Sequence, residues 1–124
     1  VWLTIIVLFT IGTFGISSMS NVPASITRMW TPSDFVLHAI EYGLLAWCML
    51  MYFHAIQFTA RRTPAAYIRA FLFSGIVGGL NELWQAHVPH RGPSGSDVLA
   101  NFVGAALFIG LFHLVKVREE MNSS

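Results

Sequence analysis

The run DFVLHAIEYGLLAWCMLMYFHAIQ, residues 34–57, decides the fold of this chain. It is longer than the roughly 20 residues that a helix needs to cross the apolar core of a bilayer. Its first turns nevertheless carry Asp34, His38, Glu41 and Tyr42, whose spacing of i, i+4, i+7 and i+8 places them along one helix face. An ionised carboxylate that faced lipid would cost several kcal/mol, so this face is predicted to point toward other helices.

The composition as a whole also favours a bilayer as the solvent. Hydrophobic residues make up 55% of the 124-residue chain and charged residues only 10%, with a mean hydropathy of +0.62. A soluble domain usually carries about 25% charged residues. The length suits a single domain over residues 1–124. The net charge of +1 gives no reason to expect a nucleic acid as partner.

Three more apolar runs fit membrane-spanning helices. They cover residues 1–17, 66–87 and 97–117. Each run is continuous and does not alternate with a period of two residues, which is typical of a helix rather than a half-buried strand. The expected fold is therefore an all-α bundle of four transmembrane helices.

The basic residues predict the orientation of this bundle. Five of them lie near the joint between the second and third helices or after the fourth helix: Arg61, Arg62, Arg69, Lys116 and Arg118. The other two joints contain only Arg28 and Arg91. Cytoplasmic loops of membrane proteins carry an excess of Lys and Arg. Both termini are therefore predicted to be cytoplasmic, in a multi-pass protein of the inner (plasma) membrane.

This topology would gather polar residues from three helices in the outer half of the membrane. They are Asp34, His38, Glu41, Asn81, Glu82, Gln85, Asp97 and Asn101. A buried carboxylate is expensive and a Gln would pack helices as well, so Glu82 is predicted to be functional. The small residues that precede it, Gly75, Gly78 and Gly79, are predicted to let another helix approach closely.

The start of the fourth helix carries two further candidates. Asp97 suits the positive N-terminal end of a helix, and Ser94 or Ser96 could cap it, so capping and a site role stay open for Asp97. Asn101 lies one turn deeper and has no capping explanation. The guanidinium of Arg91, in the preceding joint, could clamp a carboxylate or a phosphate.

Together these residues predict a polar site. The expected catalytic residues are Asp34, His38, Glu41, Glu82 and Asp97, and the expected substrate-binding residues are Tyr42, Asn81, Gln85, Arg91 and Asn101. His38 with Glu41 or Glu82 would act as acid and base. The His38-x-x-Glu41 spacing, joined by Glu82 or Asp97, could also hold a divalent metal. Because that spacing is common, acid–base chemistry without a metal or another cofactor is favoured.

Two stretches of the chain resemble the VanZ-like family of membrane proteins: SDFVLHAIEYGLL (33–45) and NELWQAHVPHRGPSGSDVLANFVGA (81–105). That family combines an Asp–His–(Glu)–Tyr helix, an acidic helix end with a Gln, an Arg in the next loop, and an Asp and Asn that open the last helix. The matching positions are Asp34, His38, Glu41, Tyr42, Glu82, Gln85, Arg91, Asp97, Asn101 and Gly104. The first acid of the family's usual acidic pair is Asn81 here, which weakens any mechanism that needs two adjacent carboxylates.

The resemblance implies a membrane protein of the bacterial cell envelope, and the family's namesake is linked to resistance to the glycopeptide teicoplanin. Three functions follow as alternatives. The polar site binds or processes a membrane lipid or a lipid-linked cell-wall precursor; or it belongs to a non-enzymatic resistance factor; or it only fixes the packing of the helices. Self-association into a homo-oligomer stays open.

Overall fold

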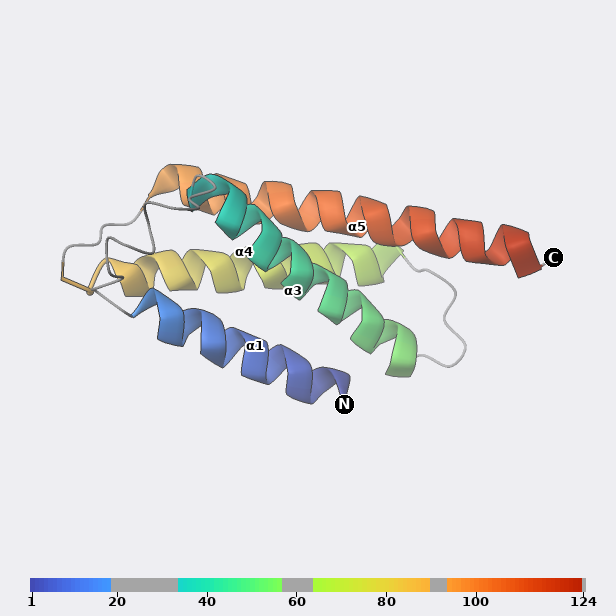
Figure 1. The fold of residues 1–124 in the computed structure, drawn as a ribbon, viewed down its shortest axis with the longest axis horizontal. Coiled ribbons are helices and arrows are strands. Elements are labelled where there is room, and N and C mark those ends of the chain that lie inside the picture. The colour runs from blue at the N-terminus through green and yellow to red at the C-terminus, as the bar shows by residue number, and fades with distance from the viewer. Residues whose placement is uncertain (19–33, 57–63, 90–93, 124) are drawn as a thin grey trace, which may run out of the picture.

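The computed structural model describes residues 1–18, 34–56, 64–89 and 94–123. In this part of the chain every regular element is a helix, which confirms the predicted all-α class. The helices are α1 (Trp2–Ser17), α3 (Asp34–Ile56), α4 (Pro64–Gln85) and α5 (Gly95–Ser123) (Figure 1). Successive described helices run in opposite directions.

This alternation gives the bundle two unlike ends (Figure 1). At one end, here called the polar end, α1 finishes at Ser17, α3 begins at Asp34, α4 finishes at Gln85 and α5 begins at Gly95. Both termini of the chain lie toward the opposite end, where α3 finishes and α4 begins. The residues that the sequence predicted to meet are therefore brought to the polar end by antiparallel packing.

The helix boundaries agree with the prediction within two residues except at the end of α5. That helix was predicted to stop at residue 117 but continues to Ser123. The apolar run ends at Val117, yet the polar residues that follow still support a helix. Lys116 pairs with Glu119 one turn later, with Nζ 2.7 Å from Oε2, and such pairs stabilise exposed helices. Hydropathy alone therefore marked the end of the apolar segment rather than the end of the helix.

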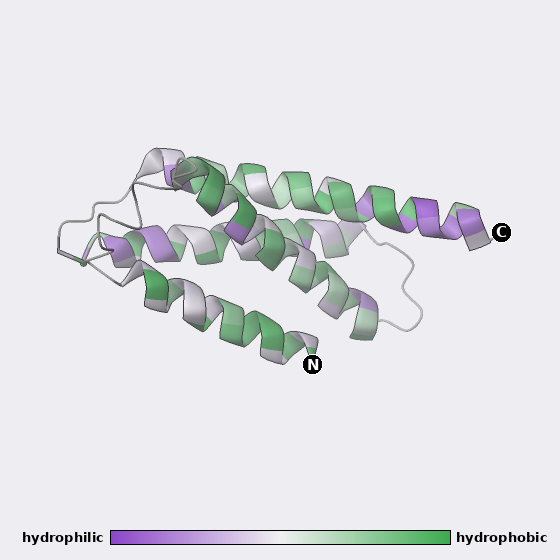
Figure 2. Cartoon of the chain, in the orientation of Figure 1, coloured by the Kyte–Doolittle hydropathy of each residue, from purple (hydrophilic) through white to green (hydrophobic). Residues whose placement is uncertain are grey.

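Two of the described helices are long and apolar enough to cross a membrane, Phe35–Ile56 and Gly95–Ser123. The apolar helix α1 is shorter, at 16 residues. Large apolar side chains are exposed on all four helices, among them Leu8, Ile40, Ile76 and Leu107. Figure 2 shows hydrophobic residues along α1 and most of α5, with hydrophilic residues toward the two ends of α5.

The core is centred on α3 and α5, the pair of helices with the most extensive contact, and includes Ile6 of α1 and Ala70 and Val77 of α4. It contains Tyr42 and Leu45 of α3, both fully buried, and Phe112 of α5. The approach is closest at Gly104, where an added Cβ would meet the backbone carbonyl of Ala39. A missing side chain at this point lets the two backbones touch.

Helix α4 is attached to the pair by small and polar residues. The Ser74 hydroxyl donates a hydrogen bond to the Tyr42 carbonyl oxygen at 2.5 Å. The predicted packing role holds for Gly75 and Gly78, where a Cβ would meet the side chains of Phe102 and Asn101. Gly79 has nothing within 4 Å of such a Cβ, so it does not share that role.

We expect Gly104→Ala to destabilise the bundle by about 1–3 kcal/mol, because the new methyl group meets backbone that cannot rotate away. The measurement is the midpoint of thermal unfolding of the purified protein in detergent. Gly110→Ala is the matched control on the same helix, since it has open space around it and is expected to be neutral or slightly stabilising. Equal midpoints for the two variants would contradict the close α3–α5 contact.

Candidate functional site

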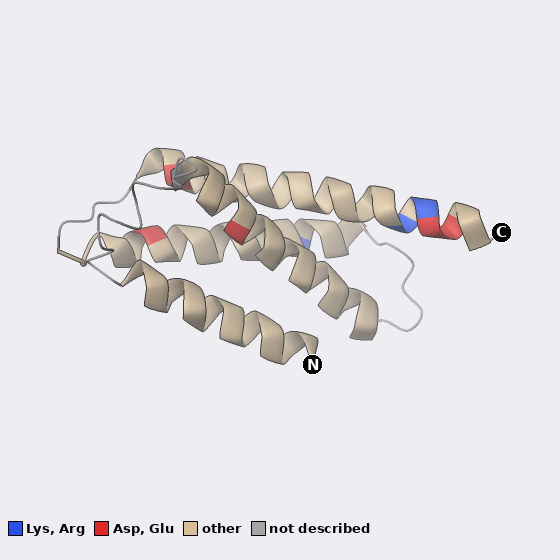
Figure 3. Ribbon diagram, in the orientation of Figure 1, with Lys and Arg blue, Asp and Glu red and all other residues tan. Residues whose placement is uncertain are grey.

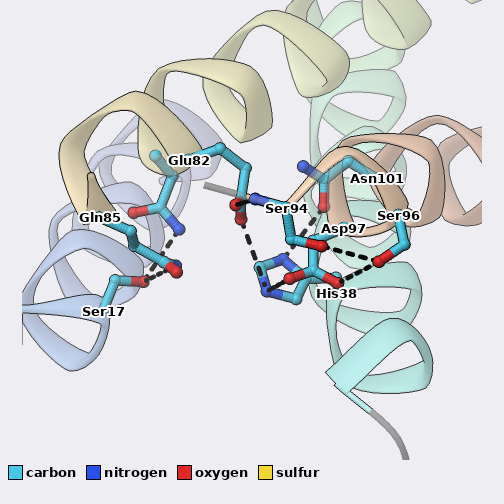
Figure 4. A network of polar contacts seen from close by, with 9 residues as sticks. Ser17, His38, Glu82, Gln85, Ser94, Ser96, Asp97 and Asn101 are labelled. Atoms are coloured by element: carbon cyan, nitrogen blue, oxygen red, sulfur yellow. Dashed lines mark hydrogen bonds and ion pairs between the residues drawn. The ribbon is translucent and has the colours of Figure 1, made fainter. Parts of the chain in front are cut away.

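His38 of α3 lies at the centre of the polar end, with partners on two other helices (Figure 4). Its Nδ1 is 3.2 Å from Oδ1 of Asn101 on α5. Its Nε2 is 3.7 Å from Oε1 of Glu82 on α4 and 3.8 Å from Oδ2 of Asp97 on α5. These four residues, His38, Glu82, Asp97 and Asn101, are called the His38 cluster below. The structure thus brings together three of the predicted catalytic residues and one predicted substrate-binding residue.

The cluster is mostly removed from solvent. The exposed fraction of the side chain is 3% for Glu82, 13% for His38 and 16% for Asp97. The Glu82 carboxylate accepts one hydrogen bond, from the backbone N–H of Ser94 to Oε2 at 3.1 Å. Its other oxygen, Oε1, has no described hydrogen-bond partner. A buried carboxylate oxygen without a partner is costly, and such groups usually mark a function or a bound ion.

The hydrogen bond to Asn101 determines what His38 can do. An amide oxygen only accepts, so this contact is a hydrogen bond in the His38 tautomer that carries a proton on Nδ1. The other ring nitrogen, Nε2, therefore faces two carboxylates either as a donor or as a lone pair. A lone pair would be repelled by both carboxylates, so this position calls for a proton or another cation between the three groups.

Asp97 belongs to the helix start and to the cluster at once. It lies in the first turn of α5, where its backbone N–H and that of Val98 donate to the Ser94 carbonyl oxygen. Its Oδ2 faces His38, while Oδ1 accepts a long hydrogen bond of 3.4 Å from the Ser96 hydroxyl. The side chain of Asp97 thus points toward the cluster from a position that also suits the helix dipole.

Asn81 and Gln85, predicted to bind substrate, join α4 to α1. Both side chains donate to the hydroxyl of Ser17, from Asn81 Nδ2 at 2.9 Å and from Gln85 Nε2 at 3.3 Å. Ser17 was missed by the sequence analysis, although a serine that ends an apolar helix next to two amides is a recognisable signal. Tyr42 stacks on His38 with ring centroids 6.1 Å apart. Its hydroxyl lies beside Asn81 but forms no hydrogen bond of ordinary geometry.

Of the other predicted residues, Glu41 lies outside the cluster, and two lie outside the described part of the structure. Glu41 is half-buried on α3 and makes no hydrogen bond or ion pair with another described residue, so the predicted His38–Glu41 metal pair is not formed. Three residues correspond to about 300° around a helix, which turns Glu41 away from His38 by roughly 60°. Asp34 begins α3, but its side chain lies outside the described part of the structure, as does the whole of Arg91.

Charge is divided unevenly between the two ends of the bundle (Figure 3). In the described part of the chain, the polar end carries the carboxylates of Glu41, Glu82 and Asp97 and no Lys or Arg. The described basic residues, Arg69, Lys116 and Arg118, lie toward the opposite end. Among the described residues, carboxylates thus supply the charge around His38, and such an arrangement suits a cationic ligand.

No family model, curated protein or solved structure matches this chain. The resemblance to the VanZ-like family therefore rests on the quoted motifs and stays a prediction.

We expect Ser17→Ala to lower the free energy of unfolding by about 1–2 kcal/mol, because two buried amide groups lose their acceptor. The matched control is Ser18→Ala, which removes a neighbouring but exposed hydroxyl that accepts from Trp84 Nε1. Thermal unfolding in detergent compares the two variants. A loss for Ser18→Ala as large as that for Ser17→Ala would mean that the buried amides do not attach α1.

Proposed function

We propose that this chain is a VanZ-like integral membrane protein of the bacterial cell envelope. In this proposal four helices cross the plasma membrane, both termini are cytoplasmic, and the polar end opens to the outer face. The His38 cluster binds or processes the head group of an envelope lipid or of a lipid-linked cell-wall precursor, and through it contributes to glycopeptide resistance. The observation that carries the proposal is the buried, unpaired oxygen of Glu82 beside His38 and Asp97.

The apolar surface supports the membrane part of the proposal. Large side chains such as Leu8, Leu83, Leu107 and Leu114 are each more than half exposed. Monomeric soluble proteins seldom expose apolar surface over their whole length, whereas lipid covers such a surface at no cost. The basic residues toward the opposite end support a cytoplasmic location of that end, according to the positive-inside rule.

The geometry of the cluster supports a ligand rather than a finished internal network. The His38–Glu82 and His38–Asp97 distances of 3.7 and 3.8 Å exceed those of ordinary hydrogen bonds. A group placed between these side chains could bond to all three. Partial exposure of His38 and Asp97 leaves the cluster approachable from the polar end, where a lipid head group would lie.

A packing role is the alternative, and one observation favours it. The amide nitrogens of Asn81 and Gln85 donate to Ser17 and so connect two helices, although Oδ1 of Asn81 has no described hydrogen-bond partner. Packing accounts for these amides but not for Glu82, since a glutamine would fill the same space without a buried charge.

We expect gently purified wild-type protein to retain a phospholipid or a polyprenyl-linked species in native mass spectrometry. Glu82→Gln should lose it, because the change keeps the shape but removes the negative charge that would pair with a positive group of the ligand or with a cation bound beside it. Arg91→Ala is expected to do the same through loss of the predicted clamp. The control is Glu119→Gln, an exposed carboxylate near the C-terminus paired with Lys116, which should retain the ligand. Equal retention and equal thermal stability in all variants would favour the packing role.

The topology has its own test, in a Cys48→Ser background because Cys48 is the single cysteine. Cysteines are introduced at two exposed positions, Ala86→Cys at the polar end and Ser123→Cys at the end of α5. A membrane-impermeant maleimide added to intact cells should label the first position only. Labelling of Ser123→Cys should require permeabilised cells, and the reverse pattern would overturn the proposed orientation.

A further inference from the structure

We propose that His38, Glu82 and Asp97 hold a divalent transition-metal ion, and that this ion receives a phosphate oxygen of the head group. The contact between the ion and the head group rests on the proposed function, whereas the metal site does not depend on it. The sequence favoured a metal-free site and considered only the His38–Glu41 pair with a third ligand. In the structure the possible ligands are instead His38, Glu82 and Asp97, which come from three helices.

The first argument is the separation of the donor atoms. One nitrogen of His38 and one oxygen each of Glu82 and Asp97 lie within 4.8 Å of one another. The nitrogen–oxygen distances are 3.7 and 3.8 Å. Ligands bound to Zn²⁺ at roughly 2.0–2.1 Å in tetrahedral geometry are about 3.4 Å apart. The three atoms therefore need only a small closure to bind one ion, whereas they are too far apart to bond to each other.

The second argument is the set of contacts that orient these donors. A metal-bound histidine usually donates its other ring N–H to an oxygen acceptor, which fixes the ring and the tautomer. Asn101 provides that acceptor through Oδ1 at 3.2 Å from Nδ1. In the same way the Ser94 N–H holds Oε2 of Glu82, which leaves Oε1 unpaired and directed at the position between the donors (Figure 4).

The third argument is electrostatic. Two buried or nearly buried carboxylates face one imidazole, and the described residues at the polar end include no Lys or Arg. A dication would neutralise both carboxylates and satisfy the orphaned oxygen of Glu82. An electronegative cluster would repel an anionic head group, whereas the same cluster with a metal ion attracts a phosphate.

The donor types limit the choice of metal. One imidazole and two carboxylates suit Zn²⁺, Mn²⁺, Co²⁺ or Fe²⁺, while the absence of sulfur among these donors disfavours Cu⁺. Three protein ligands leave at least one coordination position for water or a ligand oxygen, as in catalytic rather than structural zinc sites. Asn101 is then a positioning residue, because it acts on the ion through His38.

The experiment uses the full chain, purified in detergent without a polyhistidine tag and stripped with EDTA. Zn²⁺ and Co²⁺ are added separately. Elemental analysis then measures metal per chain, and visible absorption reports the coordination of Co²⁺. We expect one ion per wild-type chain. Glu82→Gln and Asp97→Asn should each bind at least about tenfold more weakly, and Asn101→Ala about 10–100-fold more weakly.

The matched control is His87→Ala, which removes an exposed histidine at the same end whose ring contacts the Leu83 carbonyl; it should bind as the wild type does. Circular dichroism of the stripped proteins checks that each variant is folded. If Glu82→Gln does not fold, Asp97→Asn tests the site in its place, because it changes the more exposed carboxylate. Wild-type binding no stronger than that of the cluster variants would overturn the metal site.

A second arm separates this inference from the proposed function. The probe lipids are phosphatidic acid and diacylglycerol, which differ in the phosphate group, and retention is measured with and without Zn²⁺. Retention of phosphatidic acid only by the metal-loaded protein supports both proposals. Metal binding without any effect on lipid supports the site and overturns its role in head-group binding. Lipid retention that depends on Glu82 but not on metal overturns the metal site and leaves the proposed function in place.

Discussion

The close packing of α3 on α5 is the constraint on which the polar end depends. At Gly104 the Ala39 carbonyl occupies the place that a side chain would need. His38 precedes Ala39, and Asn101 lies one turn before Gly104. The contact between the two backbones therefore determines the distance between the His38 imidazole and α5. With a wider spacing, the hydrogen bond between Nδ1 and Asn101 would be lost, and with it the direction in which Nε2 points.

The polar end has two parts with different physical roles, one beside α1 and one beside α5. On the side of α1, the amides of Asn81 and Gln85 find an acceptor in Ser17, so that neutral groups carry the helix packing. On the side of α5, Glu82 and Asp97 surround His38 without completing a hydrogen-bond network. Neutral amides can be buried and satisfied at little net cost. Carboxylates in the same environment require a positive partner, and the proposed ligand and metal ion both rest on this requirement.

The described charges are distributed differently at the two ends of the bundle. Described carboxylates of α3, α4 and the start of α5 lie at the polar end, and described basic residues lie toward the other (Figure 3). The basic residues suit an interface with anionic cytoplasmic lipid. In the proposed function, a bound cation would add to the affinity of the acidic end for an anionic head group. Under the proposed metal site, metal binding is coupled to ligand binding by electrostatics and needs no conformational change.

The sequence by itself determined the helical class, the approximate bounds of the helices and the gathering of polar residues at one end. These follow from local properties: the length of apolar runs, the helical period and the alternation of direction in a chain with short joints. The tertiary structure decided which polar residues share a site. Glu41 and His38 are close along the helix, yet the packing of α3 turns only His38 toward Glu82 and Asp97. Asn81 and Glu82 are adjacent in the chain, yet they face α1 and α5 because successive residues differ by about 100° around a helix. Such choices depend on the depth and angle at which whole helices meet, and these are set by contacts such as that of Gly104 with Ala39, which no local pattern reveals.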